Sequence, residues 1–121
     1  MRVHHLALRT NDVPRLERFY TEIFGFPVAR RDELRAVWLD AGATLLMLEQ
    51  KDEHEPDVPR GTGELVAFAI EPDERASYTA RLAKAGVVVE ARTAFTLYFR
   101  DPDGRRVGVS SYPSPSSPAS D

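Results

Sequence analysis

The chain has 121 residues, no cysteine and a formal net charge of −3. The absence of cysteine excludes disulfides, thiolate metal ligands and a cysteine nucleophile. The negative net charge differs from the excess of basic residues that is typical of nucleic-acid-binding domains. The length fits one domain, or two very small modules that share a core.

The first half of the chain predicts a strand, a helix and three further strands. Residues 2–9 alternate between apolar and polar side chains, as a half-buried strand does. Asn11 and Asp12 are candidate N-caps, the apolar positions from residue 13 to residue 23 repeat at helical spacing, and Gly25 is the natural C-cap. Residues 28–31, 36–40 and 44–49 then have the composition and length of short strands.

The second half repeats this order after a polar connector. Residues 51–63 are rich in charged residues, proline and glycine and lie between the halves. A strand at 65–70 is followed by a helix that opens at Pro72 and ends at Gly86, and apolar runs follow at 87–89, 96–99 and 105–111. Residues 112–121 are rich in proline and serine, so we expect a disordered tail there.

An internal repeat of this kind predicts two similar modules, each with the order β-α-β-β-β. We assign the first module to residues 1–50 and the second to residues 64–111. In the second module the sequence Asp-Pro-Asp-Gly at 101–104 has the composition of a tight hairpin turn, with Gly104 at the position that needs a positive φ. The predicted class is α+β, with helices on one face of mixed sheets.

The other face of each predicted sheet carries a mixture of polar and apolar side chains. Strand alternation places them on the side away from the helices. If the two curled sheets meet edge to edge, these residues line a cup of the kind that binds small molecules. The set comprises His5, Trp38, Met47, Glu49, Leu65, Thr96, Tyr98 and Arg106.

Several short motifs, in this order, resemble the vicinal oxygen chelate superfamily. They are His5-Leu6-Ala7-Leu8, Phe19-Tyr20, Gly25-Phe26, Leu48-Glu49 and the run from Tyr98 to Gly104. The superfamily includes glyoxalase I, extradiol dioxygenases, fosfomycin-resistance thiol transferases and bleomycin-resistance proteins. The resemblance implies paired βαβββ modules around a cup, often assembled as homodimers.

The resemblance also implies a metal site with one ligand from each of four equivalent strands. The first-strand histidine matches His5, and the carboxylate at the end of the first half matches Glu49. The second histidine is replaced by Leu65, and the last glutamate, four residues beyond the turn glycine, is replaced by Gly108. Since catalytic sites normally keep three protein ligands, we expect at best a weak metal site.

His5 and Glu49 therefore allow three interpretations. They are a structural or remnant pair, an acid–base dyad or ligand contact, or part of a metal site. The favoured function is a binding module of the bleomycin-resistance type that holds a small, partly aromatic molecule, with no resident cofactor. The alternatives are a glyoxalase-type lyase, isomerase or dioxygenase with one divalent ion (Ni, Zn, Mn or Fe), and a metal-free enzyme with Glu49 as its base.

The expected ligand contacts in the cup are Trp38, Met47, Thr96, Tyr98 and Arg106. The expected partners are a small molecule and a second copy of the chain, and neither nucleic acid nor membrane is expected. The chain opens without a signal-peptide pattern and contains no apolar run of membrane-spanning length, so a cytoplasmic location is expected.

Overall fold

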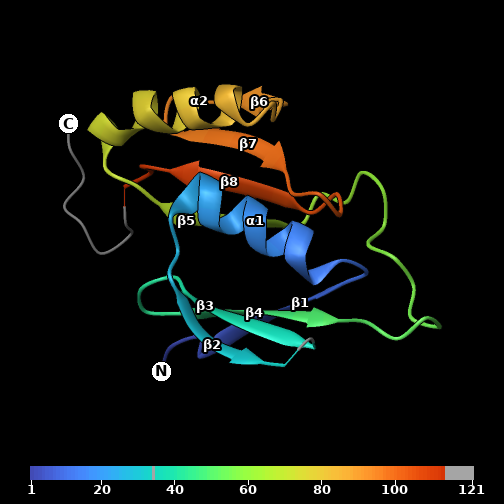
Figure 1. Cartoon of the computed structure of the whole chain (residues 1–121). Coiled ribbons are helices and arrows are strands. Elements are labelled where there is room, and N and C mark those ends of the chain that lie inside the picture. The colour runs from blue at the N-terminus through green and yellow to red at the C-terminus, as the bar shows by residue number, and fades with distance from the viewer. Residues whose placement is uncertain (34, 114–121) are drawn as a thin grey trace. The chain divides into compact units, whose positions relative to one another are not determined.

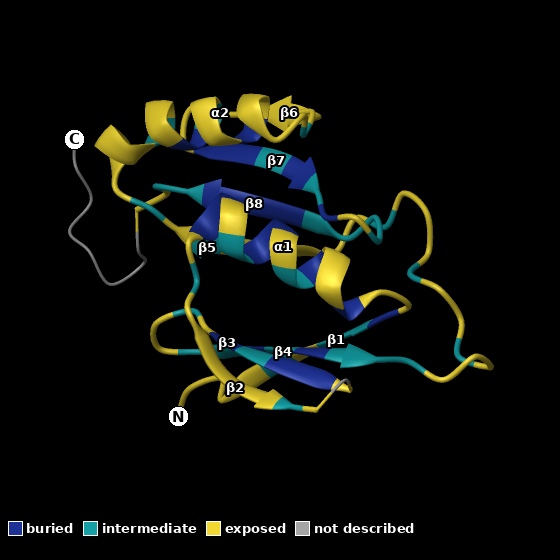
Figure 2. Cartoon of the chain, in the orientation of Figure 1, coloured by how far each residue is buried: buried dark blue, intermediate teal, exposed yellow. Residues whose placement is uncertain are grey.

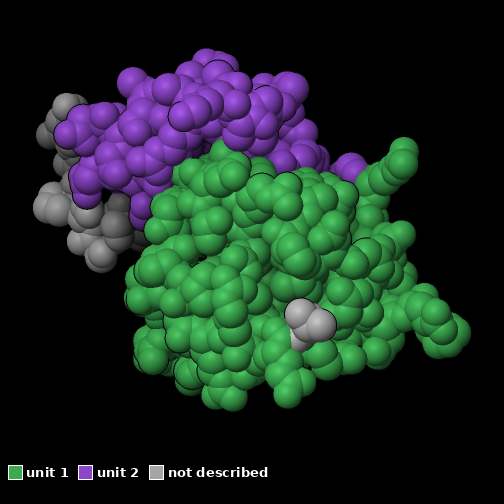
Figure 3. Space-filling model, in the orientation of Figure 1, with its two compact units in different colours: residues 1–60, 101–104 green, residues 61–100, 105–121 purple. Residues whose placement is uncertain are grey.

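A computed structural model describes residues 1–33 and 35–113. The chain divides into two compact units. Unit 1 comprises residues 1–60 together with the turn at 101–104, and unit 2 comprises residues 61–100 and the chain from residue 105 onward (Figure 3). The proposed tail at 112–121 lies largely outside the described residues. No helix in the described part of the chain is long and apolar enough to span a bilayer.

Unit 1 contains one helix and a four-stranded mixed sheet. Its elements are β1 (His5–Thr10), α1 (Val13–Phe24), β2 (Val28–Asp32), β3 (Ala36–Asp40) and β4 (Leu45–Gln50). The strand order is β1-β4-β3-β2, with β1 parallel to β4 and the other neighbours antiparallel (Figure 1). This is the predicted βαβββ module.

Helix α1 begins and ends where its sequence indicates. The Asp12 side chain accepts a hydrogen bond from the backbone N–H of Arg15, and Gly25 adopts a left-handed conformation with φ of 70°. The stripe at helical spacing is buried, while the opposite side of α1 is exposed (Figure 2). The helix packs on β3 and β4, whose inward leucines are fully buried. Burial of these apolar side chains is therefore the main force that holds α1 on the sheet.

Unit 2 repeats this architecture. It contains β5 (Leu65–Ala69), the short 3₁₀ helix η1 (Pro72–Glu74), α2 (Arg75–Lys84), β6 (Ala91–Arg92), β7 (Thr96–Arg100) and β8 (Arg106–Ser110). The strand order β5-β8-β7-β6, with β5 parallel to β8, is that of unit 1. Helix α2 lies over this sheet (Figure 1). The α+β class with two tandem βαβββ modules is thereby confirmed.

One strand of unit 2 differs from the prediction. The apolar run at 87–89 is not a strand, and β6 is confined to Ala91–Arg92. The backbone N–H of Val87 donates to the carbonyl of Leu82 and so closes the end of α2 instead of joining the sheet. Val88 is largely exposed. Val87 therefore belongs to the helix termination rather than to a strand.

The Asp-Pro-Asp-Gly segment forms the predicted tight turn and also anchors α1. The N–H of Gly104 donates to the carbonyl of Asp101 at 2.9 Å, and Gly104 has φ of 91°. The Asp101 carboxylate accepts the N–H of Asp103 and, at 2.8 Å, the hydroxyl of Tyr20. Both Tyr20 and Asp101 are buried. This hydrogen bond ties the turn to the helix of unit 1.

Candidate functional site

Each sheet has one face under its helix and one open face. In unit 1, Trp38 of β3 lies opposite Met47 of β4, and His5 of β1 lies beside Leu45. The residues on the covered face of β4 are buried, whereas Leu45, Met47 and Glu49 are half-buried. The alternation predicted from the sequence therefore places His5, Trp38, Met47 and Glu49 on the open face of unit 1.

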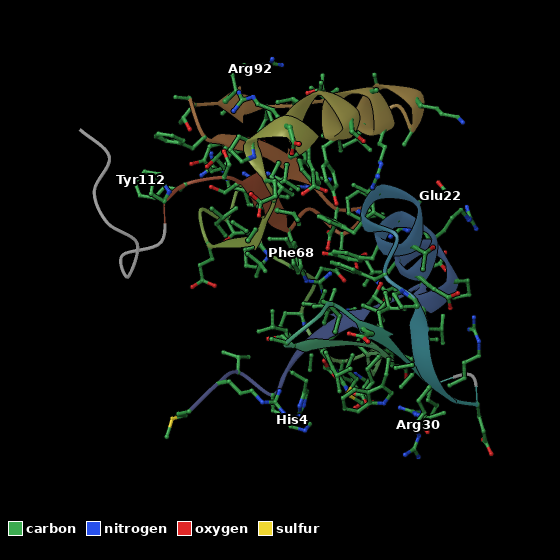
Figure 4. The ribbon with its side chains drawn as sticks, turned by 90° about the vertical axis from the view of Figure 1, so that its left-hand side faces the viewer. His4, Glu22, Arg30, Phe68, Arg92 and Tyr112 are labelled. Atoms are coloured by element: carbon green, nitrogen blue, oxygen red, sulfur yellow. The ribbon has the colours of Figure 1, made fainter. Side chains whose placement is uncertain are left out.

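His5 and Trp38 form an aromatic corner on this face. Their ring centroids are 5.1 Å apart at an interplanar angle of 60°. The indole N–H of Trp38 donates to Asp32 at 3.1 Å, and Arg30 and then Trp38 lower the pKa of the Asp32 carboxyl. The Nδ1 atoms of His5 and His4 lie 2.9 Å apart, which requires one ring to donate and the other to accept. Figure 4 labels His4 at this end of β1.

Glu49 lies away from His5. Residue pairing in the sheet sets Glu49 opposite Arg9, four positions along β1 from His5, a separation of ~13 Å along the strand. The Arg9 guanidinium donates to the carboxylates of both Glu49 and Glu55. Glu55 and then Glu49 raise the pKa of Arg9 above its usual range, and Arg9 lowers the pKa of Glu55 to about 2. Within unit 1 the structure does not form a pair between His5 and Glu49.

The open face of unit 2 brings Thr96, Tyr98 and Arg106 together. Thr96 of β7 and Ser110 of β8 share a hydrogen bond of 2.7 Å between their hydroxyls. The guanidinium of Arg106 lies 4.3 Å from the centroid of the Tyr98 ring, in cation–π geometry. Of the five predicted contacts, these three thus form one surface over two adjacent strands.

Arg100 and Glu90 also belong to this surface, and the sequence did not indicate either of them. Arg100 and Arg106 each donate a hydrogen bond to a different oxygen of Glu90, at 3.0 and 3.1 Å. Arg100 and then Arg106 lower the pKa of the Glu90 carboxyl. Arg100 follows Tyr98 by two residues, so strand alternation could have identified it. Glu90 precedes β6 in a segment without a strand pattern, and no sequence signal pointed to it.

The two positions of unit 2 that match metal ligands of the superfamily are Leu65, an aliphatic side chain, and Gly108, which has no side chain. A Cβ atom on Gly108 would lie 3.0 Å from the backbone oxygen of Leu97, 3.4 Å from Cγ2 of Thr96 and 3.5 Å from Cδ1 of Leu65. Leu65 therefore fills the space beside Gly108 where an imidazole and a carboxylate would have to meet. Neither residue offers an electron pair to a divalent ion.

The register of the two sheets also identifies the equivalent positions in unit 1. Gly108 lies two residues beyond Arg106, which is the partner of Leu65. On β4, the partner of His5 is Leu45, and Met47 lies two residues beyond Leu45. Met47 is therefore the equivalent of Gly108. Glu49 lies one further pair along the strand. Of the four equivalent positions only His5 carries a hard-metal donor, and the described residues contain no cluster of three histidine or acidic side chains suited to a metal ion.

Comparisons with known proteins identify the superfamily to which the chain is similar. The model of the glyoxalase/bleomycin resistance protein/dioxygenase superfamily matches residues 2–109. The virulence protein STM3117 of Salmonella typhimurium (strain LT2) is 28% identical over 123 residues, covering 92% of this chain and 84% of that protein.

Solved structures show the same architecture. A glyoxalase/dioxygenase from Nostoc punctiforme superposes with a TM-score of 0.78 at 22% identity, covering 93% of this chain and 92% of the other. A mutant of the fosfomycin resistance protein FosX from Listeria monocytogenes, complexed with Mn(II) and 1S,2S-dihydroxypropylphosphonic acid, superposes with a TM-score of 0.74. It is 19% identical, and the match covers 92% of this chain and 89% of the other.

Proposed function

The chain belongs to the glyoxalase/bleomycin resistance protein/dioxygenase superfamily, and from that premise we propose that it is a small-molecule binding module without a resident metal. The proposed ligand is partly aromatic. The contacts proposed for it are Trp38 and Met47 on the open face of unit 1, and Thr96, Tyr98 and Arg106 form the corresponding surface of unit 2. Binding of this kind needs apolar walls and a few polar anchors, and it needs no catalytic group.

The observation that carries the proposal is the contact between Leu65 and Gly108. A divalent ion is held by several simultaneous bonds to oxygen and nitrogen, and here an aliphatic carbon lies against a residue without a side chain. With Met47 at the third position, the donor set does not fit a catalytic ion.

The open-face side chains supply the anchors that the proposal requires. Trp38 is held by Asp32 and gives a flat apolar wall whose orientation is fixed. Arg106 is held over Tyr98 and beside Glu90. Thr96 is 6% exposed and its hydroxyl is paired with that of Ser110, so it supports this surface from below. Such pre-oriented groups lose little rotamer freedom when a ligand binds, which favours affinity.

The metal-free enzyme with Glu49 as base has weaker support. Its carboxylate accepts a hydrogen bond from the Arg9 guanidinium, which also binds Glu55, so the oxygen that would have to take up a substrate proton is already engaged by a cation. The metal-dependent alternative rests on the FosX neighbour, whose crystals contain Mn(II). Because His5 and Glu49 lie ~13 Å apart along the strand, it requires that His5 be completed by ligands from elsewhere.

We further propose a cytoplasmic homodimer. Each sheet ends in strands whose outer edge has no partner in its own sheet, namely β1, β2, β5 and β6. Exposed edges of this kind are normally covered, and pairing with a second copy is one way to cover them. Light scattering should give a mass near twice 13.6 kDa, and a species of single-chain mass alone would contradict the dimer.

The test uses the only tryptophan of the chain, which lies on the open face. Compounds that raise the melting temperature in a screen should also change the fluorescence of Trp38, and dialysis against EDTA should leave both effects intact. Trp38→Phe should abolish the optical signal, while Met47→Ala, which shortens the side chain opposite Trp38, should weaken binding. Val88→Ala, which shortens an exposed apolar side chain 77% accessible to solvent, is the matched control. Loss of binding after EDTA treatment would contradict the metal-free proposal.

A further inference from the structure

Unit 1 contains a polar cavity away from the aromatic corner of the open face. It has a volume of about 230 Å³ and lies where β1 leads into α1, beside the connector and the turn at 101–104. Four basic side chains line it (Arg9, Arg15, Lys51 and Arg60), against two carboxylates (Asp57 and Asp103). The lining therefore has an excess of positive charge.

Lys51 is the buried centre of this cavity. Only 8% of its side-chain surface is exposed. Its ammonium group donates to the carbonyl oxygen of Glu55 at 2.7 Å and to the carboxylate of Asp57 at 2.8 Å. An ammonium has three N–H donors, so among the described residues the third has no protein acceptor. Burial of an ammonium with an unpaired N–H costs folding free energy unless an oxygen atom of a ligand or of water accepts that hydrogen bond.

The other cations are unequally neutralised. Arg9 is paired with Glu49 and Glu55, and Arg15 with Asp103 at 3.0 Å. Arg60 is exposed and, within the described part of the chain, has no ion pair or side-chain hydrogen bond. The cavity thus combines one free guanidinium at its rim with a buried ammonium whose shell is incomplete.

We propose that this cavity binds a small tetrahedral oxyanion, either free phosphate or the phosphoryl group of a small molecule. Its cations come from β1, α1, the residue after β4 and the end of the connector, so they approach from several directions. That spread suits an anion with acceptors in more than one plane, whereas a planar carboxylate is served by one bidentate arginine. The volume is below the range of about 300–1,000 Å³ typical of pockets for whole ligands, which favours a head group.

Asp57 is the group that the oxyanion displaces. Its side chain is 77% exposed, whereas the ammonium that it contacts is nearly buried. The carboxylate closes the cavity from the solvent side, where it also accepts a hydrogen bond from the Asn11 amide at 3.2 Å. An incoming anion would take over the contact with Lys51 as Asp57 rotates outward into water. Its negative charge competes with any anion for Lys51, so its removal should strengthen binding.

The test is a calorimetric titration of the full chain with inorganic phosphate, at constant ionic strength maintained with sodium chloride. We expect one saturable site. Lys51→Met should weaken phosphate binding at least tenfold, Arg60→Gln about threefold, and Asp57→Asn should tighten it about threefold. Arg92→Gln removes the same charge from an exposed position in unit 2 and should change nothing. Since Arg60 is exposed, its variant remains informative even if Lys51→Met does not fold.

Phenyl phosphate separates the two sources of the anion. Binding as tight as that of phosphate assigns the site to the phosphoryl group of a larger molecule, and weaker binding assigns it to free phosphate. The proposal is overturned if phosphate gives no more heat than chloride, or if acetate binds as tightly as phosphate. It is also overturned if Arg92→Gln weakens binding as much as Arg60→Gln, or if Asp57→Asn fails to strengthen it.

Discussion

Removal of one hydroxyl from the core of unit 1 should cost a large part of its stability. The Tyr20 hydroxyl donates at 2.8 Å to the Asp101 carboxylate, and the two residues are 2% and 4% exposed. The Tyr20→Phe substitution keeps the ring and its stacking on Phe24, so it isolates the hydrogen bond. Because the acceptor is charged and buried, we expect a loss of about 2 kcal/mol.

Urea unfolding followed by circular dichroism measures this loss. With a denaturant slope of about 1.5 kcal/mol per molar, the midpoint should fall by roughly 1.3 M. Tyr112→Phe removes a hydroxyl from an exposed ring and should leave the midpoint unchanged. Equal midpoints for Tyr20→Phe and Tyr112→Phe would refute the claim that the turn at 101–104 is anchored to α1 through this bond.

Three other substitutions test separate parts of the account. Gly104→Ala should lower the free energy of unfolding by about 1–2 kcal/mol in the same urea assay, because φ of 91° is strained for any residue with a Cβ. Arg9 lowers the pKa of Glu55 from 4.5 to about 2, so the ionised carboxylate stabilises the folded chain above pH 4.5 and this contribution is lost as the pH falls from 4.5 to 2. In Glu55→Gln the free energy of unfolding should therefore fall less over this pH range than in the parent chain. Leu65→His combined with Gly108→Glu should create a pair of metal donors, and calorimetry should show Mn²⁺ binding at least tenfold tighter than in the parent chain.

Each of these substitutions has a matched control. Gly63→Ala changes a glycine that has no positive φ and has free space around it, so the urea midpoint should stay in place. Glu53→Gln removes a carboxylate from a side chain that is 90% exposed, and its acid unfolding should follow that of the parent. Gly108→Glu alone supplies one donor. If Gly108→Glu alone binds Mn²⁺ as tightly as the double variant, the assignment of Leu65 is mistaken.

Local sequence signals were sufficient for most of the fold. The stripe along α1, the C-terminal Gly25 and the repeat between halves are encoded in the sequence pattern, and the structure confirms them. Of the two N-cap candidates, Asn11 and Asp12, the structure selects Asp12. The run at 87–89 was misassigned because its strand propensity was overridden by the hydrogen bond that closes α2.

The candidate site was less predictable because it depends on register. Alternation alone places both Met47 and Glu49 on the open face, and it cannot say which of them is equivalent to Gly108. The pairing of β1 with β4 selects Met47. The partners of Glu49 and Arg106 were also hidden, since Arg9 and Glu90 reach them through pairings that are distant in sequence. Contacts of this kind become visible only once the strands are in place.

Metal stoichiometry tests the central claim most directly. The chain is purified without chelators, and bound nickel, zinc, manganese and iron are measured per chain by elemental analysis. The side chains of Leu65 and Met47 and the glycine at position 108 offer a divalent ion no oxygen or nitrogen donor. We therefore predict a metal content far below one ion per chain. The His5→Ala variant should have the same metal content. One ion per chain that is lost in His5→Ala would contradict the account.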